Sequence, residues 1–192
     1  MLKINAENPG SEPSFEEYVS VMLQNVLLEP SDEASVFRNE YKQFGSFGLA
    51  GKGTDEKIIK AVEEWFENLV QDTDVLAATK INIEDYGNIV AATDAAIENF
   101  ETIFLKQEEV QRGIVDVGVL RYPDLDNPFF KLFRIKLAAY RRSFRVLMVQ
   151  KDESGIKGSY EAMKFVPRKS IMDELRSEII EKAAREAEKM FD

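Results

Sequence analysis

The sequence contains no cysteine and no histidine among its 192 residues. Without cysteine there is no disulfide, no thiolate nucleophile and no thiolate metal site, which fits a reducing compartment. Without histidine, the usual general base near neutral pH is missing. Acidic pairs such as Glu63-Glu64 and Glu84-Asp85 point in different directions on a helix, which favours solvated surface over catalysis. We therefore expect no enzyme activity and no cofactor, although serine–lysine or paired-carboxylate chemistry stays open on residue types alone.

Long apolar runs are also missing, and none approaches the roughly 20 residues of a membrane-spanning helix. The first ten residues have neither the basic nor the apolar region of a secretion signal. We therefore expect a soluble monomeric form of the protein. Its localisation stays open, because a signal could have been removed before secretion or release.

Charge is unevenly divided along the chain, whose formal net charge is -10. Residues 1–110 carry 22 acidic and 8 basic side chains, for a net charge of -14. Residues 111–192 carry 13 acidic and 17 basic side chains, for a net charge of +4. Two interpretations stay open. The two parts neutralise each other inside one fold, or a basic face meets phosphate or an anionic membrane surface.

The sequence up to residue 109 is predicted to be mainly helical. Residues 1–13 are polar and contain proline and glycine, so they are interpreted as a flexible arm. Ser14 and Glu17 form a capping box that begins a helix. Four glycines between positions 45 and 53 argue against a helix there, and Thr54 then caps the clearest amphipathic helix. The helices expected in this part span about 14–28, 32–44, 54–70, 72–80 and 83–105.

Residues 110–167 are predicted to be mainly strands. Residues 111–122 alternate in part between valines and other side chains, as in a half-buried strand, and prolines at 123 and 128 then mark a turn. The stretch 129–149 fits a two-faced strand and, nearly as well, an amphipathic helix. We favour the strand because a hairpin signal follows. A polar turn at 151–155 is expected to join strands at 144–150 and 156–166.

A final helix is expected over about 168–191, with Ser170 and Asp173 at its start. Its predicted inner line consists of Ile171, Leu175, Ile179 and Ala183. Helices, then consecutive strands, then a helix are typical of an α+β fold with an antiparallel sheet of about four or more strands layered with amphipathic helices. We predict a single such domain over residues 14–192.

The densest group of basic residues lies in the strand region and consists of Lys131, Arg134, Lys136, Arg141, Arg142 and Arg145. Because guanidinium forks bind phosphate oxygens in a bidentate way, this basic cluster predicts contacts with lipid phosphate. The competing interpretation is a salt-bridged sheet edge, where cations prevent edge-to-edge association. Nucleic acid is disfavoured as a partner, since the protein is acidic overall and has no recognisable reading motif.

A glycine-rich segment, Gly51-Lys-Gly53-Thr-Asp-Glu56, surrounds the start of the clearest helix. It resembles the opening of one annexin repeat, in which such a loop offers backbone carbonyls to calcium. The resemblance implies a calcium site formed by Gly51, Gly53 and Asp94, since an acidic ligand follows about forty residues later in that family. The same residues also suit a simple loop that leads into a capped helix.

The order of elements resembles the Cyt-type cytolysins, which include the bacterial Cyt delta-endotoxins and the mushroom toxin volvatoxin. The resemblance rests on the helical run 58–104, the strand 115–122, the turn at 126–130 with the strand after it, and the final strand with Tyr160-Glu-Ala-Met-Lys-Phe-Val166. It implies a Cyt-like α/β/α sandwich and a soluble monomer that binds phospholipid without enzyme activity. It also implies that helices move away and that strands assemble as homo-oligomers on the membrane.

The leading prediction for function is therefore a non-enzymatic, membrane-interacting protein of the pore-forming toxin type. Its strands are long enough for a spanning β-element of about 9 to 11 residues. Helices with one apolar face can lie at a membrane interface. The alternative is a soluble module that holds a protein partner through the basic sheet edge or the apolar helix faces. A carrier with a small-molecule pocket between helices and sheet is the third hypothesis.

Overall fold

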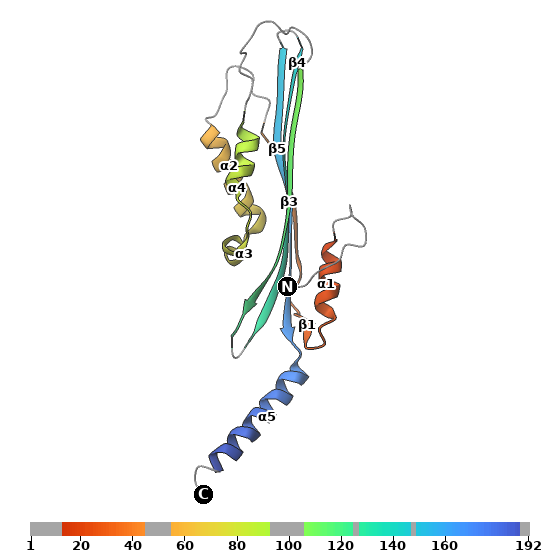
Figure 1. Cartoon of the computed structure of the whole chain (residues 1–192), viewed down its shortest axis with the longest axis vertical. Helices are drawn as coiled ribbons and strands as arrows, with labels where there is room; N and C mark the ends of the chain where they lie inside the picture. Colours follow the sequence, from red (N-terminus) through yellow and green to blue (C-terminus); the bar gives the residue numbers. More distant parts are fainter. Residues whose placement is uncertain (1–12, 45–54, 93–105, 125–126, 147–148, 189–192) are drawn as a thin grey trace. The chain divides into compact units, whose positions relative to one another are not determined.

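The computed structural model describes residues 13–44, 55–92, 106–124, 127–146 and 149–188. The helices are α1 (Phe15–Leu23), α2 (Asp55–Val70), α3 (Thr73–Ala78), α4 (Ile83–Ala91) and α5 (Lys169–Glu188). The strands are β1 (Leu28–Pro30), β2 (Val36–Phe44), β3 (Lys106–Tyr122), β4 (Phe129–Val146) and β5 (Val149–Pro167). The strands form one antiparallel sheet in the order β1-β5-β4-β3, and β2 also pairs with β5 (Figure 1). The predicted α+β fold class is confirmed.

Contacts divide the chain into two compact units. Unit 1 consists of residues 1–35, 119–132 and 163–192, and unit 2 consists of residues 36–118 and 133–162. The long strands β3, β4 and β5 contribute residues to both units. Each unit has buried apolar residues of its own.

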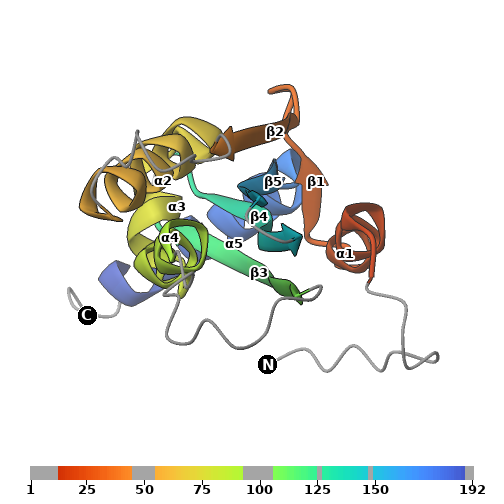
Figure 2. The ribbon, with the colours of Figure 1, turned by 90° about the horizontal axis from the view of Figure 1, so that it is seen from above.

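Unit 2 consists of a sheet with helices on one face. Figure 2 looks from above and shows α2, α3 and α4 together on one side of the strands; we call these three helices the helical layer. Gly87 lets α4 approach α2 closely, since a Cβ there would lie 3.1 Å from the Ile59 Cα atom. The amphipathic helix α2 buries Ile58, Val62, Trp65, Phe66, Leu69 and Val70. Its single apolar stripe explains why this helix forms and packs as it does.

Unit 1 combines α1, β1, α5 and parts of the long strands. The predicted capping box at the start of α1 is confirmed: the Ser14 N–H donates to the Glu17 carboxylate at 2.5 Å, and the Glu17 N–H donates to Ser14 Oγ at 3.3 Å. β1 pairs with the end of β5, where Leu28 lies opposite Pro167. The buried apolar residues of this unit are Phe15, Leu28, Leu132 and Phe165.

Two of the predicted helices are wrong in part or in whole. Residues 36–44 lie in β2, which pairs with β5 along its full length, and not in a helix. Strand alternation explains this. Arg38 and Lys42 donate to backbone carbonyls of α2, whereas Phe37 and Tyr41, which point to the other side of the strand, are exposed. The first helix ends at Leu23, earlier than predicted, and residues 28–30 form β1 instead.

The ambiguous stretch from 129 to 149 is strand as far as the structure describes it, because β4 runs to Val146 and β5 begins at Val149. The turn predicted at 151–155 is wrong, since β5 continues through these residues. Gly155 allows close approach of other side chains and is not a turn residue. A Cβ at this position would lie 2.9 Å from the Tyr140 hydroxyl oxygen and from the Lys42 carbonyl oxygen.

Two more helix predictions are corrected at their ends or faces. The helix predicted over 83–105 stops at Ala91, since the backbone angles of Ala92 (φ -57°, ψ 118°) are no longer helical. Residues 93–105 lie outside the described part of the chain. The final helix is confirmed as α5, but its predicted inner line is not buried at Leu175, which is 48% exposed. Charged residues at i, i+4 spacing, such as Glu178 and Lys182, support an exposed helix of this kind.

Candidate functional site

The side of β4 and β5 that faces the helical layer is apolar and buried in unit 2. Its buried residues are Ile135, Leu137 and Ala139 on β4, and Ile156, Gly158, Tyr160 and Ala162 on β5. Because side chains alternate along a strand, the residues between them point to the opposite side. We call that side the outer face; its residues include Phe37, Asn39 and Tyr41 on β2, Arg134, Lys136, Ala138, Tyr140 and Arg142 on β4, and Glu153, Lys157, Ser159 and Glu161 on β5.

Arginines of the sheet bind the C-terminal ends of two helices in the layer. Arg38 of β2 donates to the carbonyl oxygen of Val70 at 2.6 Å and to that of Leu69 at 3.3 Å, where α2 ends. Arg141 of β4 donates to the carbonyl oxygen of Ala92 at 2.8 Å, one residue after α4. Neither helix has a basic residue in its own last turn. The sheet therefore supplies the positive charge that a helix C-terminus favours.

Aspartates also join the helical layer to the sheet. The Asp116 carboxylate of β3 accepts hydrogen bonds from the Thr79 hydroxyl at 2.5 Å and from the Lys80 N–H at 3.2 Å. Asp72, which caps α3, accepts a hydrogen bond from the Tyr160 hydroxyl of β5 at 3.3 Å. Polar contacts thus lie at the C-terminal ends of α2 and α4, at the start of α3 and between α3 and α4.

The buried Trp65 indole N–H of unit 2 has no hydrogen-bond partner among the residues that the structure describes. Burial raises the pKa of Tyr86, and the Arg112 guanidinium, 5.3 Å from the centre of the Tyr86 ring, opposes this shift. Leaving a group such as the Trp65 N–H buried without a partner costs about 1–3 kcal/mol. The packing of the helical layer is therefore weaker than its buried apolar area alone would indicate.

The residues of the predicted basic cluster differ in their burial and in the groups that they contact. Arg134 is 9% exposed, and its guanidinium lies 3.5 Å from the Glu161 carboxylate. Lys136 and Arg142 are exposed on the outer face. Arg141 points the other way, to the end of α4. Within unit 2, strand alternation thus places two of these four residues at exposed positions of the outer face.

The other two members of the cluster lie elsewhere. Lys131 belongs to unit 1, where its ammonium nitrogen lies 5.4 Å from the centre of the Tyr122 ring. The Arg145 side chain lies outside the described part of the structure. Binding of lipid phosphate by this cluster stays a prediction.

The predicted calcium residues Gly51, Gly53 and Asp94 all lie outside the described residues. The described residues contain no group of three or more acidic side chains that could hold a metal ion. The calcium site therefore stays a prediction from the sequence.

Sequence reasoning missed a pair of tyrosines on the outer face. The hydroxyl oxygens of Tyr41 on β2 and Tyr140 on β4 are 2.5 Å apart. Tyr41 was placed in a predicted helix, which hid its position opposite Lys157 of β5. The alternation of Phe37, Asn39 and Tyr41 with inward residues is the signal that points to the strand.

Comparison with protein-family models and with curated proteins finds no match to this chain. Function is therefore argued from the two faces of the sheet and from the contacts of the helical layer. Among the described helices, none has the length and apolar character needed to cross a membrane.

Proposed function

We propose that this protein binds phospholipid membranes, without enzyme activity, and inserts β4 and β5 into the bilayer after the helical layer leaves the sheet. The observation that carries the proposal is the division of these strands into two faces. Residues such as Ile135, Leu137 and Ile156 are buried under the helical layer, whereas Lys136 and Lys157 are exposed on the outer face. An apolar face for lipid and a polar face for water are what a membrane-inserting strand needs.

The strands also have sufficient length. β4 has 18 residues and β5 has 19 residues. A tilted strand crosses the hydrocarbon core with about 9 to 11 residues. Adjacent antiparallel strands satisfy part of each other's backbone hydrogen bonding, which an inserted segment requires. Assembly into a homo-oligomer on the membrane would satisfy the backbone hydrogen bonding of the outermost strands in the same way.

The helical layer is suited to act as a removable cover. Apolar packing and the polar contacts of Arg38, Arg141 and Asp116 hold it on the sheet. The buried Trp65 indole N–H, which has no hydrogen-bond partner among the described residues, lowers the net stability of this packing. Once detached, α2 can place its single apolar stripe at the membrane interface, as amphipathic helices do.

Electrostatics support an ordered encounter with the membrane. Lys136 and Arg142 on the outer face of unit 2 are the expected first contacts with lipid phosphate. The described residues 55–92, which form the helical layer, carry nine acidic and three basic side chains. Anionic headgroups repel that charge, so departure of the layer from the membrane-facing strands is favoured electrostatically.

An engineered disulfide across the layer tests the proposal, because the chain has no cysteine of its own. The pair Thr79→Cys with Asp116→Cys links the helical layer to β3, where the native side-chain oxygens are 2.5 Å apart. We expect the oxidised protein to bind vesicles without releasing an entrapped dye, and a reductant to restore release. The matched control is Asn39→Cys with Ser159→Cys, which links neighbouring strands and leaves the layer unattached; it should release dye in both redox states.

Two results would count against the proposal. If the oxidised Thr79/Asp116 pair released dye as fast as the reduced protein, movement of the helical layer would play no part. If the protein failed to sediment with neutral and with anionic vesicles, with and without calcium, membrane binding would be abandoned.

A soluble interaction module is the second candidate function. The observation that favours it is α5, on which Leu175 is 48% and Ile180 is 61% exposed. Exposed apolar side chains on a helix can insert into a groove of a partner protein. A stable complex formed without lipid, and lost on changing Leu175 and Ile180 to serine, would favour this function over membrane insertion.

A further inference from the structure

The outer face of unit 2 contains an organised pair of tyrosines. Tyr41 lies on β2 and Tyr140 on β4, and β5 runs between these strands. Their rings are nearly parallel, at 3°, with centres 6.4 Å apart, and their hydroxyl oxygens are 2.5 Å apart. Gly155 of β5 makes this contact possible, because a Cβ at that position would lie 2.9 Å from the Tyr140 hydroxyl oxygen. The arrangement therefore depends on three strands.

Cationic side chains flank the tyrosine pair. Lys157 of β5 is the cross-strand partner of Tyr41 and is exposed. Arg142 is two residues from Tyr140 on the same face, with its guanidinium carbon 5.8 Å from the centre of the Tyr140 ring. The Glu153 carboxylate of β5 also interacts electrostatically with Tyr140. Two cations and one carboxylate therefore lie on the same face as the tyrosine pair, and together they carry a net positive charge.

The hydroxyl groups are suited to donate a hydrogen bond to an anion. Burial, the hydrogen bond with Tyr41 and the Glu153 charge raise the pKa of Tyr140 to about 12, against the opposing effect of Arg142. The hydroxyl thus stays protonated at neutral pH. When one tyrosine donates to the other, the accepting tyrosine still has its own proton to donate to a ligand.

We propose that Tyr41, Tyr140, Arg142 and Lys157 bind the phosphomonoester headgroup of a membrane lipid, of which phosphatidic acid is the simplest. A phosphomonoester carries up to two negative charges and three terminal oxygens, so it can accept from two cations and a hydroxyl at once. The phosphodiester of other phospholipids carries one charge and two such oxygens. This inference rests on the proposed function, because it names the lipid that the protein binds.

Vesicle sedimentation tests which lipid headgroup the protein prefers. Vesicles of phosphatidylcholine are mixed with phosphatidic acid or with phosphatidylserine and compared at equal surface potential. We expect binding to phosphatidic acid to be about tenfold tighter, which corresponds to one additional charge-assisted hydrogen bond. Inorganic phosphate at a concentration equal to that of the lipid phosphate should leave this preference unchanged, because the free ion lacks the membrane contacts that also hold the lipid. Displacement by inorganic phosphate would instead assign the site to a free anion and overturn the lipid proposal.

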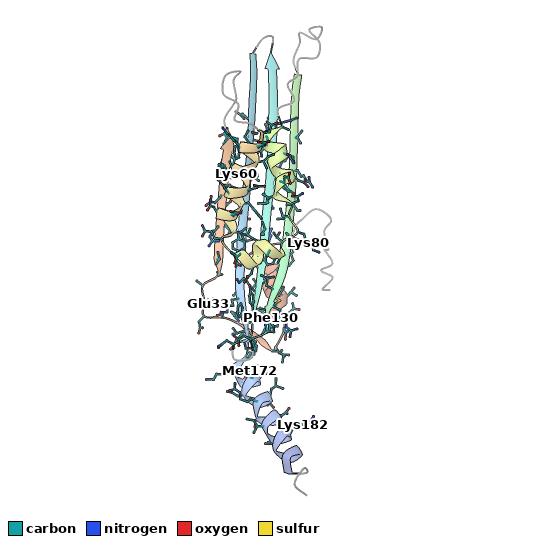
Figure 3. The ribbon with its side chains drawn as sticks, turned by 90° about the vertical axis from the view of Figure 1, so that its left-hand side faces the viewer. Glu33, Lys60, Lys80, Phe130, Met172 and Lys182 are labelled. Carbon is teal, nitrogen blue, oxygen red and sulfur yellow. The ribbon has the colours of Figure 1, made fainter. Side chains whose placement is uncertain are left out.

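Substitutions test which side chains bind the headgroup. Tyr41→Phe with Tyr140→Phe, and separately Lys157→Gln, should abolish the preference for phosphatidic acid, while Glu153→Gln should increase affinity because it removes the nearby negative charge. The matched controls are Tyr18→Phe in α1 and Lys60→Gln, an exposed lysine of α2 (Figure 3). These should bind as the unchanged protein does. Retention of the preference in the tyrosine and Lys157 variants would overturn the assignment, and circular dichroism would show that each variant is folded.

Dye release from the same vesicles separates this inference from the proposed function. Release without any preference for phosphatidic acid would overturn the headgroup inference and leave membrane insertion supported. A preference that depends on the tyrosines and Lys157, without dye release from any vesicle, would support the headgroup site and overturn insertion.

Discussion

The Arg141 guanidinium donates a hydrogen bond to the carbonyl oxygen of Ala92 at 2.8 Å, immediately after the end of α4. Arg38 makes the same kind of contact with Val70 at the end of α2. Both arginines come from strands of unit 2, and both helices lack a basic residue in their own last turn. Each contact gives a hydrogen-bond donor to a carbonyl that has none within its helix. It also places positive charge near the negative end of the helix dipole. The sheet thus holds the helical layer at the ends of two helices.

Replacement of Arg141 by alanine should weaken the attachment of the helical layer. A hydrogen bond from a charged donor to a helix C-terminus contributes about 1–2 kcal/mol. For a chain of this size, that loss lowers the melting temperature by roughly 2–8 °C. Under the proposed function, the variant should also release dye from vesicles faster than the unchanged protein. Thermal unfolding followed by circular dichroism, together with the dye-release rate, measures both effects.

The control for Arg141 is Lys157→Ala, which also removes a cation from a central strand but from the exposed outer face. Such a surface change should alter the free energy of unfolding by no more than about 0.5 kcal/mol. Equal loss of stability in the two variants would show that the Ala92 contact has no particular role.

Asp116 provides a second, local test of the same attachment. Asp116→Ala removes the acceptor of the Thr79 hydroxyl and the Lys80 N–H, so the Lys80 amide should exchange its hydrogen with solvent faster. Asp116→Asn keeps an acceptor oxygen in place and should retain most of the protection. Hydrogen exchange measured at single residues gives the result, with amides at the centre of α2 as the internal reference. Unchanged exchange at Lys80 in the alanine variant would contradict the role of Asp116.

The sequence predicts well those elements that depend on residues close together in the chain, within one helical turn or along one face of a single helix. The helix at 55–70 is confirmed because Ile58, Val62 and Leu69 repeat at helical spacing and are buried together. The capping box of Ser14 and Glu17 is confirmed because both partners lie three residues apart.

Features that depend on distant partners were not predicted. Residues 36–44 form a strand because β5 is there to pair with them. Arg141 and Arg142 are neighbours in the sequence, yet strand alternation sends them to opposite faces. Tyr41 and Tyr140 are 99 positions apart, and nothing local in either segment indicates that their hydroxyl groups meet.

Gly158 is predicted to be intolerant of even a methyl group. A Cβ there would lie 2.6 Å from Leu137 Cδ2, 2.9 Å from the Lys136 carbonyl oxygen and 3.0 Å from Leu69 Cδ2 of α2. The backbone oxygen cannot easily move, so Gly158→Ala should destabilise the protein by roughly 1–3 kcal/mol and push α2 away from the sheet. Chemical denaturation measures the loss.

The matched control for Gly158 is Gly113→Ala in β3, where the nearest atom is the Leu137 carbonyl oxygen at an ordinary 3.6 Å. This variant should keep the denaturation midpoint of the unchanged protein. Similar midpoints for both variants would mean that α2 does not pack closely on β5 at Gly158.

Stability at high pH should depend on Tyr140. Its folded-state pKa is raised to about 12, chiefly by burial and by the hydrogen bond with Tyr41, whereas an unfolded tyrosine titrates near about 10. Between these values the unfolded state loses the proton while the folded state keeps it, so this contribution to stability is present below pH 10 and is lost as the pH rises toward 12. Glu153 and Arg142 also act on this hydroxyl electrostatically, Glu153 by raising the pKa of Tyr140 and Arg142 by lowering it. Denaturation midpoints from pH 9 to 12 should therefore fall less steeply for Tyr140→Phe than for the unchanged protein, and parallel curves would show that Tyr140 titrates as an ordinary exposed phenol.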